Sequence, residues 1–315
     1  MSDLAPTELN LAQREVLEQL GATREQRPVF SESLARELRA ELEIGLEPFL
    51  ASLGPDEELR LAKRQLSTVL GCQRRYLAER DAPFVVSVAI ARGTVSHKAI
   101  ELGINRQGDK TPSLLVDDAL ARLENDDQWV SEFLQTCDQA ERAELRSAAV
   151  EHVSKFEECW PELKPAWRPV TESTMIAELV RDRVVLRGKV DLTIGRPDGM
   201  RAGKVLIDFK SGRSMPSHLD DLRFYALVET LRIGTPPRRL ATYYLDQGRF
   251  LPEDVTVDLL ESTVSRVIAS AERIVALAEF DGEPTESPGP ACRWCAERDD
   301  CPSGQRFIED DPGQI

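Results

Sequence analysis

Two acidic residues and a lysine stand where they could act on one substrate bond. Asp208 and Lys210 lie at the end of a short apolar run, 205–209, that is typical of a buried strand. Side chains two positions apart on a strand point to the same face, so the carboxylate and the amine share one side. Asp191 lies on the preceding apolar segment, 184–194, and converges with Asp208 if the two strands pair. A bare Asp-x-Lys is more often a structural ion pair, so the surrounding motifs decide its meaning.

This combination of side chains suits one kind of chemistry. Two carboxylates, completed by waters, are suitable ligands for a hard cation such as Mg²⁺ or Mn²⁺. Such a cation orients an attacking water and neutralises charge on a phosphodiester oxygen. A neighbouring lysine positions the nucleophile or stabilises the developing charge. The pattern therefore indicates metal-assisted hydrolysis of a phosphodiester.

Three short motifs resemble, in this order, the RecB-type branch of the PD-(D/E)XK nucleases. They are Gly-x-x-x-His at 93–97, Gly-x-x-Asp at 188–191 and Asp-x-Lys-Ser-Gly at 208–212. The resemblance implies a set of metal ligands made of His97, Asp191, Asp208 and the main-chain carbonyl of Phe209. It implies that Lys210 is the catalytic lysine, acting beside the two acids.

The helix expected over 220–232 departs from this family at one position. The family usually carries Gln-x-x-x-Tyr here, whereas the present stretch reads Asp221-Leu222-Arg223-Phe224-Tyr225. Tyr225 matches and is assigned to the catalytic site, but Asp221 replaces the glutamine. An acid at this position is expected to weaken contact with DNA or to alter the metal environment. Glu172 fits a less specific acidic position of the family.

Three of the six cysteines form a close group near the end of the chain. Cys292, Cys295 and Cys301 have the spacing C-x2-C-x5-C. Three thiolates at this spacing can share one metal centre, and both iron–sulfur clusters and zinc sites commonly take four cysteines. Cys72 is the best candidate for the fourth ligand.

One upstream and three downstream cysteines bracket the candidate catalytic segments. This layout resembles the iron–sulfur nucleases of the AddB type and the CRISPR-associated adaptation nuclease. The resemblance implies a structural 4Fe-4S cluster that clamps the C-terminal tail against a helix near the N-terminus. A zinc site built from the same four thiolates remains the alternative. Cys137 and Cys159 fit no ligand spacing and are interpreted as core or incidental residues.

Basic and aromatic residues flank the cysteines. Arg74, Arg75 and Tyr76 follow the first cysteine, and Trp294 lies within the last group. If a cluster joins these segments, they form a surface that could hold single-stranded DNA by stacking and phosphate contact. The competing interpretation is that Trp294 packs on the cluster and that the arginines are solvated.

The composition limits the class of protein. Of the 315 residues, 41% are hydrophobic and 30% are charged, which is ordinary for a soluble globular protein. The net charge of −15 argues against a broad phosphate-binding surface, although not against a local basic groove. No run approaches the roughly 18 apolar residues of a membrane span, and the N-terminus lacks a secretory signal. We therefore expect a cytoplasmic protein without a membrane partner, in which thiols stay reduced.

The elements that must position these residues change from helical to extended along the chain. Helical spacing covers most of 1–60, a stretch from Leu59 to Leu70, residues 87–104 and about 114–160. Strands are expected at 173–179, 184–194, 205–209 and 240–245, with helices at 220–232 and 257–278. Together with the resemblance, this order implies an α/β fold. Its restriction-endonuclease-like core has a small mixed sheet flanked by helices, with a helical N-terminal region and a helical insert.

Three parts follow from this pattern. We expect a helical N-terminal region over 1–60, and a nuclease core over 61–282 with a helical insert at about 105–165. A cysteine-rich tail over 283–315 closes an iron–sulfur site with Cys72. The two remaining histidines, His152 and His218, match no motif and are interpreted as solvent-facing.

The resemblance implies a Mg²⁺- or Mn²⁺-dependent deoxyribonuclease, an exonuclease on single-stranded DNA or DNA ends, in repair, recombination or defence. No helicase motif is visible, so a helicase or recombination partner would be a separate chain. One alternative is a catalytically weak iron–sulfur module that binds DNA or serves a larger helicase–nuclease complex. Another is a zinc-dependent adaptor in which the Asp-x-Lys is coincidental.

Overall fold

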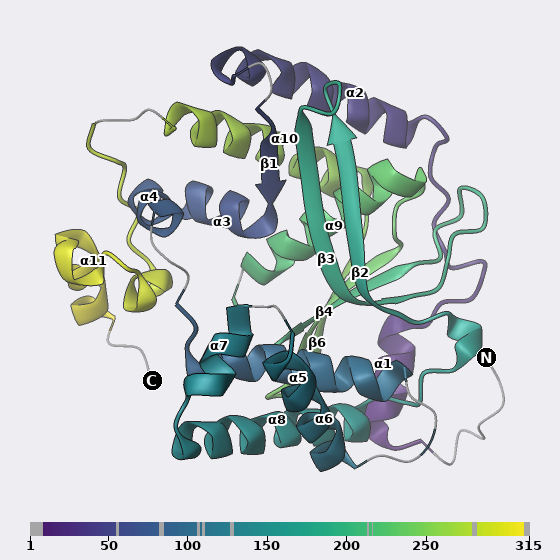
Figure 1. Ribbon diagram of the computed structural model, residues 1–315. Coiled ribbons are helices and arrows are strands. Elements are labelled where there is room, and N and C mark those ends of the chain that lie inside the picture. The colour runs from purple at the N-terminus through teal and green to yellow at the C-terminus, as the bar shows by residue number, and fades with distance from the viewer. Residues whose placement is uncertain are drawn as a thin grey trace.

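A mixed sheet of six strands forms the middle of the molecule (Figure 1). The computed structural model describes residues 9–54, 57–81, 85–105, 108, 111–126, 129–212, 214–215, 217–278 and 282–311. The strands are β1 (Leu59–Ala62), β2 (Val170–Leu179), β3 (Val184–Ile194), β4 (Val205–Lys210), β5 (Arg239–Tyr244) and β6 (Arg249–Asp254). Their order is β1-β3-β4-β5-β6, and β2 pairs with β3.

The strand β3 organises this sheet, because three other strands pair with it. β2 pairs antiparallel along nearly the whole of one edge, so β1 and β4 share the other edge. β1 runs parallel to β3 and its ladder ends with Ala62 opposite Arg187, whereas the antiparallel ladder of β4 ends with Ile207 opposite Leu192. The two strands therefore run toward each other. Between their ladders they leave residues 188–191 of β3 without a partner on this edge.

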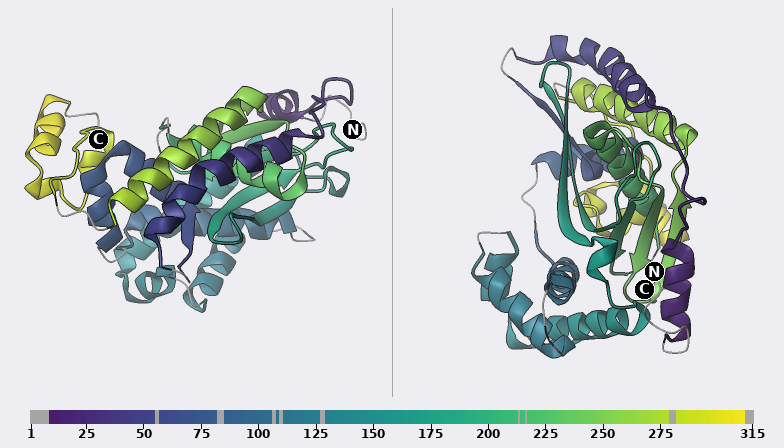
Figure 2. Two further views of the ribbon diagram at one scale, coloured as in Figure 1. Left: turned by 90° about the horizontal axis from the view of Figure 1, so that it is seen from above. Right: turned by 90° about the vertical axis from the view of Figure 1, so that its right-hand side faces the viewer.

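Helices cover both faces of the sheet (Figure 2). In the described part of the chain the α-helices are α1 (Leu11–Leu20), α2 (Leu34–Leu46), α3 (Lys63–Gly71), α4 (Gln73–Asp81), α5 (Val88–Asn105), α6 (Pro112–Glu124), α7 (Trp129–Thr136), α8 (Gln139–Cys159), α9 (Ser217–Ile233), α10 (Val257–Ala276) and α11 (Pro302–Asp310). Short 3₁₀ helices span Glu47–Ser52, Pro165–Trp167, Pro290–Trp294 and Arg298–Asp300. None of these helices is long and apolar enough to cross a membrane.

The two faces of the sheet bury separate hydrophobic cores. Leu206 and Leu240 point into one core, which the leucines of α2 and the apolar faces of α9 and α10 complete. Ile207, Phe209 and Tyr243 point into the other core, which α1, α5, α6, α7 and α8 cover. This division follows from the alternation of side chains along β4 and β5. The mixed α/β, restriction-endonuclease-like fold expected from the sequence is confirmed.

Some element predictions were wrong. Leu59 and Leu61 belong to a strand, not to a helix, and they alternate with the exposed Arg60 because β1 is paired with β3. The helical stretch expected over about 114–160 is divided among three helices, α6, α7 and α8. β6 was not predicted, because only its pairing with β5 holds this half-exposed segment extended. The division into domains stays a prediction.

The helix α2 tests whether the N-terminal region is part of the main core. Its buried Leu42 belongs to the same core as the sheet, whereas Ile44 on the same helix is 75% exposed. Leu42→Ala is expected to lower the free energy of unfolding by about 2–5 kcal/mol, because it leaves a cavity. Ile44→Ala is the control and is expected to change it by less than about 0.5 kcal/mol. Urea denaturation measures both, and equally small losses would contradict the packing described here.

Candidate active site

The carboxylate of Asp208 lies at the centre of a charged cluster at the end of β4. Its side chain is 3% exposed, and its Oδ2 lies 2.8 Å from Nζ of Lys210. Its Oδ1 lies 3.4 Å from Nζ of Lys63, the first residue of α3. Burial alone would raise the pKa of Asp208, but Lys63 and Lys210 outweigh it and hold that pKa well below its usual range. Asp208 is therefore ionised at neutral pH.

Asp191 and His97 form the opposite side of the same cluster. Oδ1 of Asp191 lies 3.4 Å from Nδ1 of His97 on α5, and its Oδ2 accepts a hydrogen bond of 2.6 Å from the amide of Phe209. Burial would lower the pKa of His97, but Asp191 and Asp208 outweigh it and raise the pKa. The ring of His97 stands edge-on to Phe209, with ring centroids 6.0 Å apart. The three motifs are thus adjacent in space.

Asp221 replaces the family's glutamine and bridges two lysines. Its Oδ2 lies 3.2 Å from Nζ of Lys210 and 3.3 Å from Nζ of Lys63. Burial would lower the pKa of each lysine, but the negative charges of Asp208 and Asp221 have the larger combined effect. The pKa values of both lysines are therefore raised. Lys63 was not among the predicted site residues, because the segment before it was assigned to a helix. As the residue that follows β1, Lys63 reaches the acid at the end of β4 and the acid on α9.

The buried ring of Tyr225 packs against this cluster. Its side chain is 2% exposed, and burial raises its pKa above the usual range. Nζ of Lys63 lies 5.0 Å from the centroid of its ring, a cation–π distance. A Cβ at Gly188 would lie 2.5 Å from Cδ1 of Tyr225, so the glycine of the second motif lets the ring approach β3. The assignment of Tyr225 as a catalytic residue stays a prediction, and its burial favours positioning of Lys63.

The donor set of this cluster fits a hard divalent cation. It combines an imidazole, two carboxylates and a main-chain carbonyl. Oδ2 of Asp208 is buried and makes no hydrogen bond, although Lys210 lies close to it. Across the described ranges, however, no three His, Cys, Asp or Glu side chains are arranged to hold a metal ion. In this cluster the two carboxylates point apart, because Asp208 contacts Lys63 and Lys210 while Asp191 contacts His97 and the amide of Phe209.

A partly buried hydrogen-bonded row of Ser96, His152 and Asp246 lies beside the cluster, and the prediction for His152 was wrong. This histidine is not solvent-facing but 4% exposed. Its Nδ1 lies 2.9 Å from Oγ of Ser96, and its Nε2 lies 3.2 Å from Oδ1 of Asp246. His218 also differs from the prediction, because it is half-buried with Nδ1 3.1 Å from the hydroxyl of Tyr244.

The three residues of the row resemble a Ser-His-Asp triad, but their place in the fold suits the positioning of neighbouring segments and not catalysis. Ser96 is wholly buried, with Oγ 2.9 Å from both Nδ1 of His152 and the carbonyl of Arg92, so its hydroxyl does not face substrate. At the other end, Asp246 accepts a hydrogen bond from the amide of Gly212. The row therefore connects the helix of His97 with the loop that follows Lys210.

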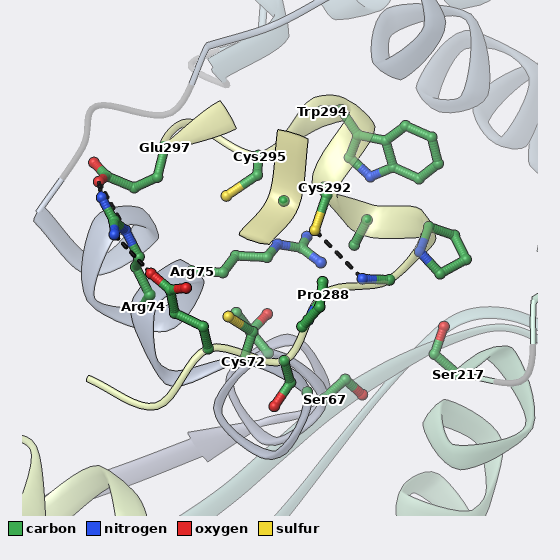
Figure 3. Close-up of a pocket in the computed structure, with 18 of the residues that line it drawn as sticks. Ser67, Cys72, Arg74, Arg75, Ser217, Pro288, Cys292, Trp294, Cys295 and Glu297 are labelled. Carbon is green, nitrogen blue, oxygen red and sulfur yellow. Dashed lines mark hydrogen bonds and ion pairs between the residues drawn. The ribbon is translucent and has the colours of Figure 1, made fainter. Parts of the chain in front are cut away.

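The four predicted cysteine ligands meet at a second place. Cys72, Cys292, Cys295 and Cys301 line one cavity of about 710 Å³ (Figure 3). A Cβ built on the buried Gly304 would lie 3.4 Å from Sγ of Cys301 and 3.5 Å from Sγ of Cys292. Burial raises the pKa of Cys295; the thiols of Cys72 and Cys292 add to this, and the Glu297 amide and Arg75 oppose it. Cys137 and Cys159 do not line this cavity.

The same cavity reaches the charged cluster. Lys63 and Asp221 line it together with the cysteines, and α3 runs from Lys63 to Gly71, directly before Cys72. The C-terminal segment with α11 lies next to α4 (Figure 1). The two candidate sites are therefore neighbours joined by one helix.

The residues predicted to contact DNA have mixed environments. Arg74 pairs with Glu286 at 2.7 Å and with Glu297 at 3.2 Å, which holds the tail on α4 (Figure 3). Arg75 pairs with Glu79 at 2.6 Å. Tyr76 is buried beside Val69 and Leu277, so its ring does not offer a stacking face. Trp294 is 61% exposed.

The buried His152 predicts a pH dependence of stability. Burial lowers the pKa of His152, and the neighbouring Asp246 only partly offsets this effect. At pH values between the folded and unfolded pKa, His152 is therefore protonated in the unfolded chain and neutral in the folded protein. The resulting stability is fully present above about pH 6.5 and is lost as the pH falls toward the folded pKa. We expect the unfolding free energy to fall less between about pH 7 and pH 5 in His152→Gln than in the wild type. Urea denaturation measures it, with the exposed Glu144→Gln as control. Equal slopes for wild type and His152→Gln would contradict the interpretation.

Comparison with known proteins identifies the family of the chain. A structure described as "Putative exonuclease" from Eubacterium rectale is 12% identical over 85% of this chain and 98% of its own, with a TM-score of 0.46. The structure of SSO0001 is 14% identical over 85% and 97%, with a TM-score of 0.35. The curated proteins give no match. The model of the PD-(D/E)XK nuclease superfamily matches residues 60–302, which contain all three motifs and the four cysteines. The chain belongs to the PD-(D/E)XK nuclease superfamily.

Proposed function

We propose that this protein is a Mg²⁺- or Mn²⁺-dependent deoxyribonuclease, acting as an exonuclease on single-stranded DNA or DNA ends. One observation carries the proposal. Asp191 on β3 accepts a hydrogen bond from the amide of Phe209 on β4, next to Asp208, and Lys210 lies beside the Asp208 carboxylate. When bound, the divalent cation orients the attacking water and neutralises charge on the scissile phosphate. Its proposed ligands are His97, Asp191, Asp208 and the main-chain carbonyl of Phe209.

The lysines of the cluster have a defined part in this proposal. Lys210 and Lys63 are protonated, because the acids around them raise their pKa values. A protonated lysine donates hydrogen bonds and takes up no further proton. We therefore infer that Lys210 binds and orients phosphate oxygens and stabilises the charge that develops on them, rather than acting as a base.

The context of the reaction follows from the family resemblance. We infer a cytoplasmic role in DNA repair, recombination or defence, with any helicase or recombination partner on a separate chain. The exposed indole of Trp294 supports contact with single-stranded DNA, since an aromatic face can stack on any base. Arg74 and Arg75 remain candidates for phosphate contact, although both are paired with glutamates.

Removal of either central charge tests the proposal. Asp208→Asn and Lys210→Ala are each expected to lower the rate of cleavage at least about 100-fold, as loss of a group that stabilises transition-state charge does. The measurement is the initial rate on end-labelled single- and double-stranded DNA with Mg²⁺ or Mn²⁺, using protein purified without oxygen. Asp198→Asn, in an exposed turn, is the matched control and should cleave normally. Unchanged cleavage in both site variants would contradict the catalytic assignment.

A second candidate function is a DNA-binding module, or a subunit of a helicase–nuclease complex, with weak cleavage of its own. The observation that favours it is the engagement of both lysines by Asp221, at the position where the family usually has glutamine. A carboxylate there competes with substrate phosphate for the same ammonium groups. Wild-type protein that binds the labelled DNA without cleaving it would support this candidate.

We further propose that Cys72, Cys292, Cys295 and Cys301 hold a structural 4Fe-4S cluster. In support, all four thiols line one cavity of about 710 Å³. The ion pairs of Arg74 with Glu286 and Glu297 keep the tail beside α4.

Loss of one cysteine tests the cluster. Cys301→Ala is expected to abolish bound iron and acid-labile sulfide and to lower the melting temperature, because the metal centre adds its binding free energy to folding. Cys137→Ala, outside the cavity, is the matched control and should keep both. Iron, sulfide and zinc are measured on protein purified without oxygen. Full iron retention in Cys301→Ala would refute the ligand assignment, and zinc without iron in the wild type would favour the zinc alternative.

A further inference from the structure

A second cavity, of about 520 Å³, lies at the end of the sheet where α1 packs. Its walls are the end of α1 with the loop that follows, the Pro165–Trp167 turn, the end of β3, the first residue of β4 and Arg238, which precedes β5. In Figure 1, α1 and the C-terminal cysteine segment lie on opposite sides of the molecule. This cavity is therefore distinct from the one that the cysteines line.

The lining of this cavity is basic. It contains Arg27, Lys164, Arg168, Arg196 and Arg238, and no aspartate or glutamate. Among the described residues, no carboxylate forms an ion pair with any of the five, whereas the neighbouring Arg24 and Arg239 pair with Asp198 and Asp254. In a chain with a net charge of −15, so many unneutralised cations around one cavity indicate an anionic ligand.

Several buried donors of the cavity residues also have no acceptor. Arg238 is 8% exposed, and its Nη2 donates to the carbonyl of Leu20, but its Nε has no partner among the described atoms. Nε of Arg27 and Nε1 of the buried Trp160 likewise lack an acceptor. Burial, with Arg239 and Arg27 nearby, lowers the pKa of Arg238 to about 10. A buried donor without an acceptor is costly, so a ligand with several acceptor oxygens would be strongly favoured here.

Capping of α1 does not account for the whole group. Arg238 and Arg239 donate to the carbonyls of Leu20 and Gln19, which would otherwise be unsatisfied at the end of a helix. The side chains of Lys164, Arg168 and Arg196 form no hydrogen bond or ion pair with other described residues. They are available to a ligand.

The size and walls of the cavity select among anions. A bare phosphate would leave most of the space empty, whereas 520 Å³ accommodates a small organic molecule. Trp167, which is half-buried, contributes aromatic surface on which a nucleobase can pack. A Cβ at Gly203 would collide with the carbonyl of Arg196 and lie 3.3 Å from Nη1 of Arg27, so this glycine lets both arginines approach.

We infer that this cavity is a second binding site, for a nucleotide held by its phosphate, either a free mononucleotide or the terminal nucleotide of a strand. The site lies three residues along β4 from the charged cluster, from Val205 to Asp208, which is about 10 Å. Binding here requires no cleavage, so the inference goes beyond the proposed function and is independent of it.

Titration calorimetry in EDTA tests this site, because nuclease activity is silent without divalent cations. The probes are dAMP, deoxyadenosine, inorganic phosphate and an octathymidylate with or without a 5′-phosphate. Arg168→Ala/Arg196→Ala is expected to bind the phosphorylated probes at least tenfold more weakly than the wild type. Arg36→Ala/Arg249→Ala removes the same charge from two exposed positions outside the cavity and should bind like the wild type. Melting temperatures verify that both variants fold.

The outcomes separate the possible ligands. Binding of dAMP but not of deoxyadenosine, lost in Arg168→Ala/Arg196→Ala alone, assigns a free mononucleotide. Binding that requires the 5′-phosphorylated octathymidylate assigns the end of a strand. Binding of no phosphorylated probe, or equal loss in both double variants, overturns the site. A protein inactive as a nuclease that still binds dAMP would retain this inference while the proposed function fails.

Discussion

A buried negative charge, the carboxylate of Asp208, constrains the arrangement of the elements around it. An ionised carboxylate removed from water is strongly destabilising unless cations replace the lost hydration. Two lysines do so from different elements: Lys63 follows β1, and Lys210 ends β4. Both can reach Asp208 because β1 and β4 approach each other along one edge of β3 and stop short of meeting. A strand of only four residues is thus essential to the site, since it delivers one of the two compensating charges.

The replacement of glutamine by Asp221 follows the same electrostatic logic. Two lysines within reach of a single carboxylate would repel each other, and Asp221 provides a second negative charge between them. The ring of Tyr225 lies against the ammonium group of Lys63. The ring fits beside β3 because Gly188 has no side chain. The departure at one position and the extra lysine at another are therefore parts of one arrangement. A glutamine in place of Asp221 would leave the pair of lysines with less compensation.

The sequence predicts local features of this molecule better than distant partnerships. Asp191, Asp208 and Lys210 could be identified because each lies in a short motif on an apolar segment, and the core strands follow from their own hydrophobic runs. Lys63 could not, because β1 owes its extended form to a partner more than 120 residues later in the chain. The prediction that His152 faces solvent was wrong for a related reason. Its polar ring can be buried because Ser96 and Asp246 each form a hydrogen bond with one of its nitrogens. Burial of a polar side chain depends on partners that spacing along the chain does not reveal.

The helix α3 has a consequence for how the two ends of its cavity communicate. It begins at Lys63 and ends directly before Cys72, and its nine residues rise about 13 Å in total. It packs on α9 and α10, so one packed element connects the charged cluster with the cysteine cavity. Coupling between two binding events is reciprocal in free energy. Where a ligand at Lys63 changes the affinity of the cysteine cavity for a second ligand, that second ligand changes the affinity at Lys63 by the same factor.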